Sequence, residues 1–340
     1  MQYSSVVGLV LAAGKGTRMK SEIPKVLHEV FFSPMIHHVL AAVHPLALGR
    51  NFVVTGHQHQ LVEESLRGHP VSFVHQSQQL GTGHAVLACE GELRSHTGPV
   101  LILCGDTPLI KTETLQQFLR VHLESASLVT VMTTTVAEPH NYGRIVSDEH
   151  GNIAGIVEEK DATAAQKEIR EINAGIYCVD ARFLFEALHR VGTDNMQGEV
   201  YLTDIVAIAV GGGIHVHKFC CQDSEEILGV NSRRELVQAH SVLQRRYISL
   251  LMDSGVTIIQ PESVTIEKTV TIGNDTVIYP NTSLTGVCKI GSGVRVDSFV
   301  KIHACTVGDF VRIGSFTHLQ QTHIPSWSTV APHTVDIRMG

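Results

Sequence analysis

A glycine-rich loop near the N-terminus has the residue types that bind phosphate. The segment Leu11–Met19 reads Leu-Ala-Ala-Gly-Lys-Gly-Thr-Arg-Met and directly follows an apolar run. Glycines let the main chain approach a ligand and present its N–H groups to phosphate oxygens. Arg18, and Lys25 after Pro24, add the cationic side chains that an anionic ligand also needs. The spacing matches neither a Walker loop nor the Rossmann G-x-G-x-x-G pattern, so composition alone leaves a purely structural β–α turn as an equal alternative.

The elements that would position this loop alternate between buried strands and helices. Short apolar runs and helical patterns follow one another over about the first 220 residues, which predicts βαβ units and an α/β fold with a mostly parallel sheet. The predicted strands are Val6–Ala12, Phe52–Thr55, Ser72–His75, Val100–Leu103, Ser127–Thr135, Arg144–Ser147, Ile153–Val157, Asn173–Val179 and Ile214–Phe219. The predicted helices are Met35–Val43, Leu61–Arg67 and His84–Leu93.

A different pattern begins after a predicted connecting helix over Arg233–Asp253. Aliphatic residues recur every six positions, and the register slips by one before it resumes at Val307 and Ile313. Repeats this short bury their apolar face only by stacking, which predicts the coils of a parallel β-helix; alternating antiparallel strands are the weaker alternative. The recurring residues are Ile266, Ile272, Ile278, Leu284, Ile290, Val296 and Ile302. We therefore predict three parts, at residues 1–230, 231–254 and 255–340.

The composition excludes several classes of protein. The chain of 340 residues carries 26 basic and 33 acidic side chains, a net charge of −7, which does not favour a general nucleic-acid binder. No apolar run reaches the roughly 18 to 20 residues needed to span a bilayer. The seven cysteines are odd in number and form no C-x-x-C pair, which predicts reduced thiols in the cytoplasm and no zinc site.

Further motifs give the glycine loop a specific context. The segments 76–85 (QSQQLGTGHA), 104–109 (CGDTPL), 142–145 (YGRI), 156–161 (IVEEKD), 171–175 (EINAG), 198–204 (GEVYLTD) and 229–231 (GVN) follow it in order. Together with the loop, this set resembles the uridyltransferase half of the bifunctional family that uridylylates N-acetylglucosamine 1-phosphate and acetylates glucosamine 1-phosphate. The resemblance extends from residue 5 to about residue 320.

The resemblance implies a fold and a set of ligands. The fold is a Rossmann-like nucleotidyltransferase domain with a mixed, mostly parallel sheet, followed by a short left-handed parallel β-helix. The reaction is transfer from UTP to N-acetylglucosamine 1-phosphate, which yields UDP-N-acetylglucosamine, a precursor of peptidoglycan and lipopolysaccharide, and pyrophosphate. The implied cofactor is Mg²⁺, and the implied assembly is a homotrimer formed through the β-helix, with neither nucleic acid nor membrane as a partner.

The resemblance also assigns roles to single residues. Arg18 and Lys25 are expected to act in catalysis on the phosphates, and Asp106 and Asn231 to bind the metal. Carboxylate and amide oxygens suit Mg²⁺, which takes further ligands from water and phosphate. The nucleotide-binding residues are Leu11, Ala12, Ala13, Gly14, Gln76, Gly81 and Thr82. The sugar-binding residues are Gly143, Glu158, Asn173 and Asn231, with Tyr201 and Thr203 as further candidates.

The chain departs from the family pattern in three places. Asn141 stands where the family has the first glycine of Gly-Tyr-Gly-Arg, and Cys104 stands where some members have tyrosine. The later coils that carry the acetyltransferase residues have no counterpart before Gly340, so acetyl transfer is not expected. The alternatives are a hexapeptide acyltransferase using His303, His318 or His323, a non-catalytic UDP-sugar-binding protein, and glucose 1-phosphate as the sugar substrate.

Overall fold

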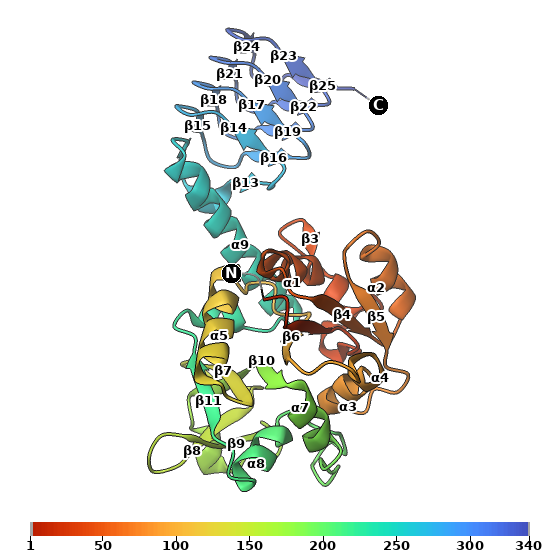
Figure 1. Ribbon diagram of the computed structural model, residues 1–340. Helices are drawn as coiled ribbons and strands as arrows, with labels where there is room; N and C mark the ends of the chain where they lie inside the picture. The colour runs from red at the N-terminus through yellow and green to blue at the C-terminus, as the bar shows by residue number, and fades with distance from the viewer. Residues whose placement is uncertain (1–2, 339–340) are drawn as a thin grey trace. The chain divides into compact units, whose positions relative to one another are not determined.

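The predicted strands of the first two thirds of the chain form one nine-stranded mixed sheet (Figure 1), in which Ser72–His75 is a largely exposed edge strand and not a buried one. The structure is a computed structural model that describes residues 3–338. The order of the main strands is β11-β7-β10-β6-β1-β4-β5, and β8 and β9 form a hairpin beside β10. Their bounds are β1 Val7–Leu11, β4 Arg50–Thr55, β5 Ser72–His75, β6 Pro99–Cys104, β7 Val129–Thr135, β8 Arg144–Ser147, β9 Ile153–Val157, β10 Glu171–Asp180 and β11 Val216–Cys220.

The strands at the centre of this sheet are parallel. β1 pairs in parallel with β4 on one side and with β6 on the other, and β5 extends the same direction beyond β4. β10 runs antiparallel to both β6 and β7. The predicted mixed, mostly parallel sheet is therefore confirmed. Because parallel strands end at the same edge, the segments that follow Leu11, His75 and Cys104 meet there.

Helices cover both faces of the sheet. Alternate residues of a strand point to opposite faces, and accordingly Leu9 joins one apolar cluster and Val10 the other. The first cluster includes residues of α3, α7 and α8, and the second includes residues of α1, α2 and α5. The helices are α1 Met35–Val43, α2 His59–Ser65, α3 Thr82–Leu87, α4 Glu90–Leu93, α5 Thr112–Ser125, α6 Ala164–Lys167, α7 Ala181–Leu188 and α8 Asp204–Gly211.

One helix prediction was wrong. The segment His84–Leu93 contains two short helices, α3 and α4, and not one. The chain tightens between them, because the N–H of Cys89 bonds the carbonyl of Val86 three residues back.

The last third of the chain forms a left-handed parallel β-helix, as the family resemblance implied. Its strands belong to three parallel sheets, with orders β12-β15-β18-β21-β24, β13-β16-β19-β22-β25 and β14-β17-β20-β23. Thr271 pairs with Lys289 eighteen residues on, but Lys289 pairs with Thr306 only seventeen residues on. The slip seen in the sequence is therefore a coil one residue shorter. The repeating aliphatic residues lie inside, and Ile266, Leu284 and Val296 are fully buried.

The β-helix strands are two or three residues long. They are β12 Thr257–Ile258, β13 Thr265–Ile266, β14 Thr271–Ile272, β15 Val277–Ile278, β16 Ser283–Thr285, β17 Lys289–Ile290, β18 Arg295–Val296, β19 Lys301–His303, β20 Thr306–Val307, β21 Arg312–Ile313, β22 His318–Gln320, β23 His323–Ile324, β24 Thr329–Val330 and β25 Val335–Ile337. The predicted helix over Arg233–Asp253 is α9. The chain divides into two compact units, which separate between Leu236 and Val237.

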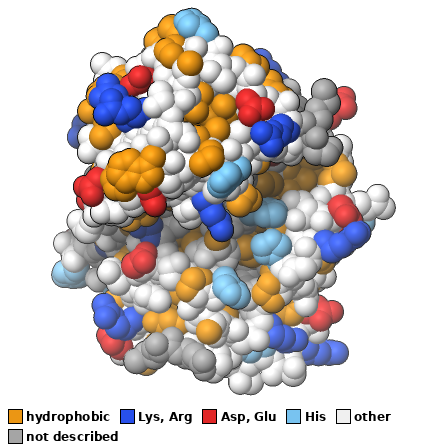
Figure 2. Space-filling model, turned by 90° about the horizontal axis from the view of Figure 1, so that it is seen from above, with side chains coloured by type: hydrophobic (Ala, Val, Ile, Leu, Met, Phe, Trp, Pro, Cys, Tyr) orange, Lys and Arg blue, Asp and Glu red, His pale blue; other side chains and the backbone are white. Residues whose placement is uncertain are grey.

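Acidic and basic side chains are interspersed on the face shown in Figure 2, with hydrophobic side chains exposed among them. All seven cysteines are free. Across residues 3–338, no helix combines the length and the apolar character required to cross a membrane.

A buried histidine makes the first unit sensitive to acid. His122 on α5 is 2% exposed, and its Nδ1 lies 2.8 Å from Thr130 Oγ1 on β7. Burial lowers the pKa of His122 to about 4, below its ordinary value near 6.5. The stability that depends on neutral His122 is therefore complete above pH 6.5 and is lost as the pH falls through 4.

We expect His122→Asn to reduce the loss of stability at acidic pH. Asparagine can still bond Thr130 and has no proton to take up between pH 7.5 and 4.5. The difference in unfolding free energy between wild type and variant should shift by about 2–3 kcal/mol over that interval. Urea titrations at several pH values measure this shift. The exposed His150→Asn serves as control, and a parallel pH profile for His122→Asn and wild type would contradict the assignment.

Candidate active site

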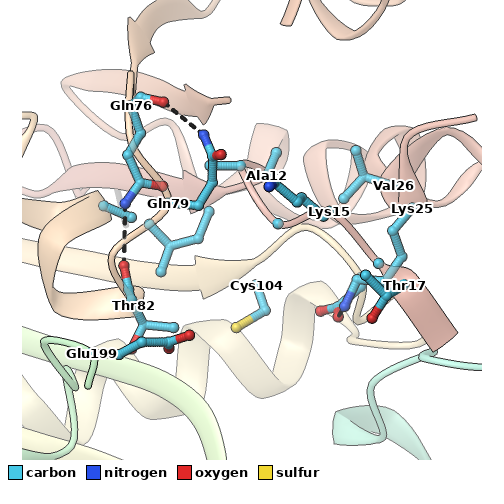
Figure 3. A pocket seen from close by; sticks show the side chains of 17 residues that line it. Ala12, Lys15, Thr17, Lys25, Val26, Gln76, Gln79, Thr82, Cys104 and Glu199 are labelled. Carbon is cyan, nitrogen blue, oxygen red and sulfur yellow. Dashed lines mark hydrogen bonds and ion pairs between the residues drawn. The ribbon is translucent and has the colours of Figure 1, made fainter. Parts of the chain in front are cut away.

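A cavity of about 470 Å³ opens at the edge where β1 and β6 end (Figure 3). In the close-up, Gln76, Thr82 and Glu199 lie toward one end, Thr17 and Lys25 toward the other, and Cys104 lies between. The residues that line the cavity are Leu11, Ala12, Ala13, Gly14, Lys15, Gly16, Thr17, Lys25, Val26, Gln76, Gln79, Gly81, Thr82, Ala85, Cys104, Asp106 and Glu199. All seven predicted nucleotide-binding residues are among them, together with Lys25 and Asp106.

The glycine loop shapes one wall of this cavity. A Cβ on Gly14 would meet nothing within 4 Å, so this part of the main chain is open to a ligand. Gly16 has φ +61°, and a Cβ there would lie 2.6 Å from the Cβ of Lys25. Glycine is required at position 16 both for the left-handed backbone and for the close passage of Lys25. The loop therefore brings Lys25 to the cavity as well as presenting its own N–H groups.

The ammonium of Lys25 joins two residues that are distant in the sequence. Lys25 Nζ forms an ion pair with Asp106 Oδ2 and donates a hydrogen bond to Asn231 Oδ1 at 3.0 Å. The side chains of Lys25 and Asp106 are 17% and 16% exposed. Asn231 itself is not a lining residue of the cavity, but its amide oxygen points to the same cation as the carboxylate of Asp106.

The segment that carries Asn231 is attached directly to the strand end that carries Asp106. The N–H of Val230 donates to the carbonyl of Asp106 at 2.8 Å. The N–H of Asn231 donates to Glu235 Oε2 at 2.7 Å, and the N–H of Glu235 lies 3.3 Å from Ser232 Oγ at the start of α9. Helix capping therefore orients the residue whose amide oxygen faces Lys25.

These contacts allow a test of whether a divalent cation fits. The carboxylate of Asp106 and the amide oxygen of Asn231 already converge on one positive charge, the ammonium of Lys25. Residues 3–338 contain no group of three or more His, Cys, Asp or Glu side chains arranged to hold a metal. Two oxygen ligands fit Mg²⁺ when phosphates and water supply the others.

Gln76 lies at the other end of the cavity with a fixed orientation. Its side chain is buried, and its Nε2 donates to the carbonyl of Gly81 at 3.2 Å and lies 2.9 Å from His84 Nδ1. The carbonyl of Gly81 can only accept, so the amide nitrogen must face it and Oε1 is the free acceptor. The carbonyl of Gln76 accepts a hydrogen bond from Gln79 Nε2 at 3.0 Å.

Three of the four predicted sugar-binding residues form a second group, and the fourth, Asn231, lies with Lys25 and Asp106. A Cβ on Gly143 would lie 3.5 Å from Glu158 Oε2 and 3.6 Å from Asn173 Cβ. Thr203 Oγ1 donates to Glu158 Oε1 at 3.1 Å. Burial raises the pKa of Glu158, while the hydrogen bond from Thr203 lowers it and the charge of Asp204 raises it. Gly143, Glu158, Asn173 and Thr203 are thus together, although none of them lines the cavity.

Cys104 lies between the two groups. It lines the cavity, and its Sγ lies 3.6 Å from the carbonyl of Gly175 on β10. Burial raises the pKa of Cys104 to about 12, so its thiol is neutral at physiological pH. A neutral thiol is a weak nucleophile, so we assign Cys104 no role as a nucleophile.

Arg18 is the predicted catalytic residue that the cavity does not include. Its side chain is exposed, in the short 3-10 helix Thr17–Met19 that the buried Met19 anchors. Its charge nevertheless acts on Tyr142. Burial raises the pKa of Tyr142 to about 12, and the charge of Arg18 acts in the opposite direction.

Sequence reasoning missed five polar lining residues. They are Lys15, Thr17, Gln79, Cys104 and Glu199. All five lie inside motifs that the sequence analysis identified. A motif does not show which of its side chains face the cavity, so these residues could not be singled out from the sequence. Glu199 is held by Asn195, whose Nδ2 donates to its carbonyl at 2.6 Å.

Comparisons with known proteins show which proteins the chain is similar to. Residues 8–191 match the MobA-like NTP transferase domain. The chain is 43% identical over 329 residues to the bifunctional protein GlmU of Pelobacter propionicus, over 96% of this chain and 72% of that protein. It is 44% identical over 311 residues to the bifunctional protein GlmU of Desulfotalea psychrophila, and 92% of each chain is covered. A UDP-glucose pyrophosphorylase solved with UDP-glucose has a TM-score of 0.57 at 21% identity, over 71% of this chain and 98% of that chain, and shares the fold.

We expect the Lys25 ammonium and a divalent cation to compete for the same two oxygens. Lys25→Met keeps most of the stem and removes the charge, so Asp106 and Asn231 lose a positive neighbour. The dissociation constant for Mn²⁺ in the nucleotide-free protein should then fall about tenfold. Electron paramagnetic resonance of free Mn²⁺ measures it. Lys15→Met, which removes another cation from the cavity wall, is the control; weaker Mn²⁺ binding by Lys25→Met than by wild type would contradict competition.

Proposed function

The chain belongs to the bifunctional GlmU family and carries its nucleotidyltransferase domain, and from this we propose that it is a UDP-N-acetylglucosamine pyrophosphorylase. In the proposed reaction, UTP and N-acetylglucosamine 1-phosphate give UDP-N-acetylglucosamine and pyrophosphate. The observation that supports this most strongly is the convergence of Lys25, Asp106 and Asn231 beside an open glycine loop. We also propose Mg²⁺ as the cofactor, a homotrimer as the assembly and the cytoplasm as the location.

The proposed reaction needs no general base. A phosphate oxygen of the sugar 1-phosphate is already an anion, and it attacks the α-phosphorus of UTP in line with the departing pyrophosphate. The task of the protein is to align the two reactants and to compensate negative charge. Lys25 and Arg18 would bind phosphate oxygens, and Asp106 and Asn231 would hold Mg²⁺, which supplies further charge neutralisation. The loop N–H groups around Gly14 would bind the remaining phosphate oxygens.

The positively charged ammonium of Lys25 can pair with two anionic partners in succession. Without substrate its ammonium is neutralised by Asp106. When the nucleotide arrives, its phosphates offer a greater negative charge, and Lys25 can exchange one anionic partner for another at small electrostatic cost. The exchange also leaves the oxygens of Asp106 and Asn231 available to the metal.

Gln76 is proposed to select the base. Because its Nε2 donates to Gly81, its Oε1 can accept the N3–H of uracil. Cytosine carries an unprotonated acceptor at N3, and two acceptors facing each other in a buried site repel. The position of the Gln76 amide depends on Gly81, to whose carbonyl it donates. The φ of +111° at Gly81 and its close approach to Val200 exclude a side chain there.

Gly143, Glu158 and Asn173 are proposed to bind the sugar. The carboxylate of Glu158 can accept from hydroxyl groups, and Asn173 offers an amide that can donate and accept. Gly143 leaves space, since a side chain there would press against Ile156 at 3.0 Å. Glucose 1-phosphate is the nearest alternative substrate.

One experiment tests the proposal. Pyrophosphate release is measured with UTP and a panel of sugar 1-phosphates, with and without Mg²⁺, alongside a free-thiol assay with acetyl-CoA and glucosamine 1-phosphate. We expect Mg²⁺-dependent release with N-acetylglucosamine 1-phosphate and no thiol release. Binding of UTP without turnover would favour a non-catalytic UDP-sugar-binding protein, preference for glucose 1-phosphate would change the substrate, and thiol release would show acyl transfer.

Asp106→Asn should reduce kcat/KM for UTP at least a hundredfold. The variant keeps the shape of the side chain but loses the charge that would hold the cation. Removing one electrostatic group of this kind from an active site lowers the rate by a factor of about 10² to 10³. Pyrophosphate release gives the rate, and thermal unfolding shows whether the fold is intact. Asp253→Asn, an exposed carboxylate at the end of α9, is the control; a folded Asp106→Asn protein with wild-type turnover would refute the role.

Gln76→Ala should narrow the preference for UTP over CTP by about tenfold or more. In the wild type, Oε1 of Gln76 would accept a hydrogen bond from N3–H of uracil but would be repelled by the unprotonated N3 of cytosine. A buried polar group left without a partner costs about 1–3 kcal/mol. The ratio of kcat/KM for the two nucleotides measures this preference. Gln79→Ala removes an amide from the same cavity and should affect both nucleotides alike. An unchanged ratio in Gln76→Ala would exclude Gln76 as the base-reading residue.

A further inference from the structure

We infer that the hydroxyl of Tyr142 positions Asn231 for the divalent cation, by holding the main chain of Gly229 against the site. Tyr142 would be a positioning residue, not a catalytic one, because it acts through Gly229 and touches no reacting atom. The inference rests on the proposed metal site formed by Asp106 and Asn231.

Gly229 forms the wall of the proposed metal site. A Cβ on Gly229 would lie 3.5 Å from Asn231 Nδ2 and 3.9 Å from each carboxylate oxygen of Asp106. The carbonyl of Gly229 accepts a hydrogen bond from Asn231 Nδ2 at 3.3 Å. That bond turns the amide so that Oδ1 faces Lys25. A shift of Gly229 would therefore rotate the oxygen of Asn231 away from the cation.

Tyr142 holds Gly229 through a hydrogen bond from a distant segment of the chain. The N–H of Gly229 donates to Tyr142 Oη at 3.2 Å across 87 residues of sequence. The N–H of Val230 bonds Asp106 and the N–H of Asn231 bonds Glu235. Three consecutive N–H groups thus have partners from three different segments, and the tyrosine hydroxyl is the one side chain that reaches from the sugar-binding segment.

The main chain of Tyr142 is itself held firmly. Asn141 has φ +69°, a left-handed conformation that asparagine tolerates better than most residues. The guanidinium of Arg144 is fully buried, donates to the carbonyl of Tyr142 and pairs with Glu159 Oε2 at 2.6 Å. A buried guanidinium is rarely left without strong partners, so it fixes the Tyr142 carbonyl. The tyrosine ring therefore extends from a rigid base.

A contact between Tyr142 and the sugar is the competing explanation, since Gly143 is the next residue. The geometry favours the positioning role because the Tyr142 hydroxyl is directed to Gly229 and not to Glu158 or Asn173. The two explanations differ in what they predict: positioning alters cation binding, whereas sugar contact alters the KM for the sugar 1-phosphate.

Tyr142→Phe tests the inference in the full chain. Mn²⁺ binding in the presence of UTP and without sugar is measured by electron paramagnetic resonance, so the readout does not depend on turnover. The titration is repeated without nucleotide, because UTP itself binds Mn²⁺, and there we expect the dissociation constant for Mn²⁺ to rise about tenfold, the lower end of the range for residues that orient metal ligands. Saturating Mg²⁺ should restore most of kcat, and the KM for N-acetylglucosamine 1-phosphate should change less than twofold. Tyr3→Phe removes a hydroxyl that donates to the carbonyl of Gln116 at 3.2 Å and is the matched control.

A double-mutant cycle then tests the path through Asn231. If Tyr142 acts through Asn231, Tyr142→Phe should cause no further loss of Mn²⁺ affinity in an Asn231→Ala background. Wild-type Mn²⁺ affinity in Tyr142→Phe, additive losses in the cycle, or a raised sugar KM with unchanged cation affinity would each overturn the inference. Absence of uridylyl transfer in the wild type would refute the proposed function separately, because the Mn²⁺ measurement stands without it.

Discussion

The parallel pairing of β1 with both β4 and β6 is the constraint on which the first unit depends. Parallel neighbours must end at the same edge, so the loops after Leu11 and Cys104 are forced together although about 90 residues separate them. β5 adds Gln76 to the same edge through its pairing with β4. This is the general reason why open parallel sheets bind ligands beyond the carboxyl ends of their strands. The loops that follow Leu11, His75 and Cys104 take their positions from this pairing.

Charge balance at that edge depends on a close approach between two main-chain segments. Gly16 leaves room for the stem of Lys25, and Lys25 in turn neutralises Asp106. A carboxylate only 16% exposed is costly without a partner, so the ion pair stabilises the empty site. In the proposed reaction this partner is exchanged for phosphates and a divalent cation, so the ion pair would stabilise the site until substrate binds.

The β-helix is stabilised by its own apolar cluster. Its apolar cluster is built from the six-residue repeat and shares no residue with the two clusters of the sheet. Its turns contain residues with a strained backbone. They are Phe299, Phe310 and Phe316, which have positive φ angles and half-exposed side chains. Phe299 and Phe316 stack at 5.0 Å with their rings nearly parallel, which offsets part of the backbone strain. Local repetition is enough to specify this architecture, because each coil needs only its neighbours.

The sequence by itself determined the motifs and the strands of the sheet, but it did not reveal α5, α7 and α8. Apolar runs and turn residues located β5, β8 and β9 to the residue, and three- and four-residue spacing located α9, because these signals are local. Only the tertiary structure decided which motif residues face one another. Lys25 meets Asp106 across 81 residues and Asn231 across 206, Arg18 lies outside the cavity wall, and Tyr142 reaches Gly229. No local pattern encodes such contacts, since they follow from strand order and from the space that single glycines leave open. The helix break at Cys89 has the same origin, because packing on the sheet overrides helical periodicity there.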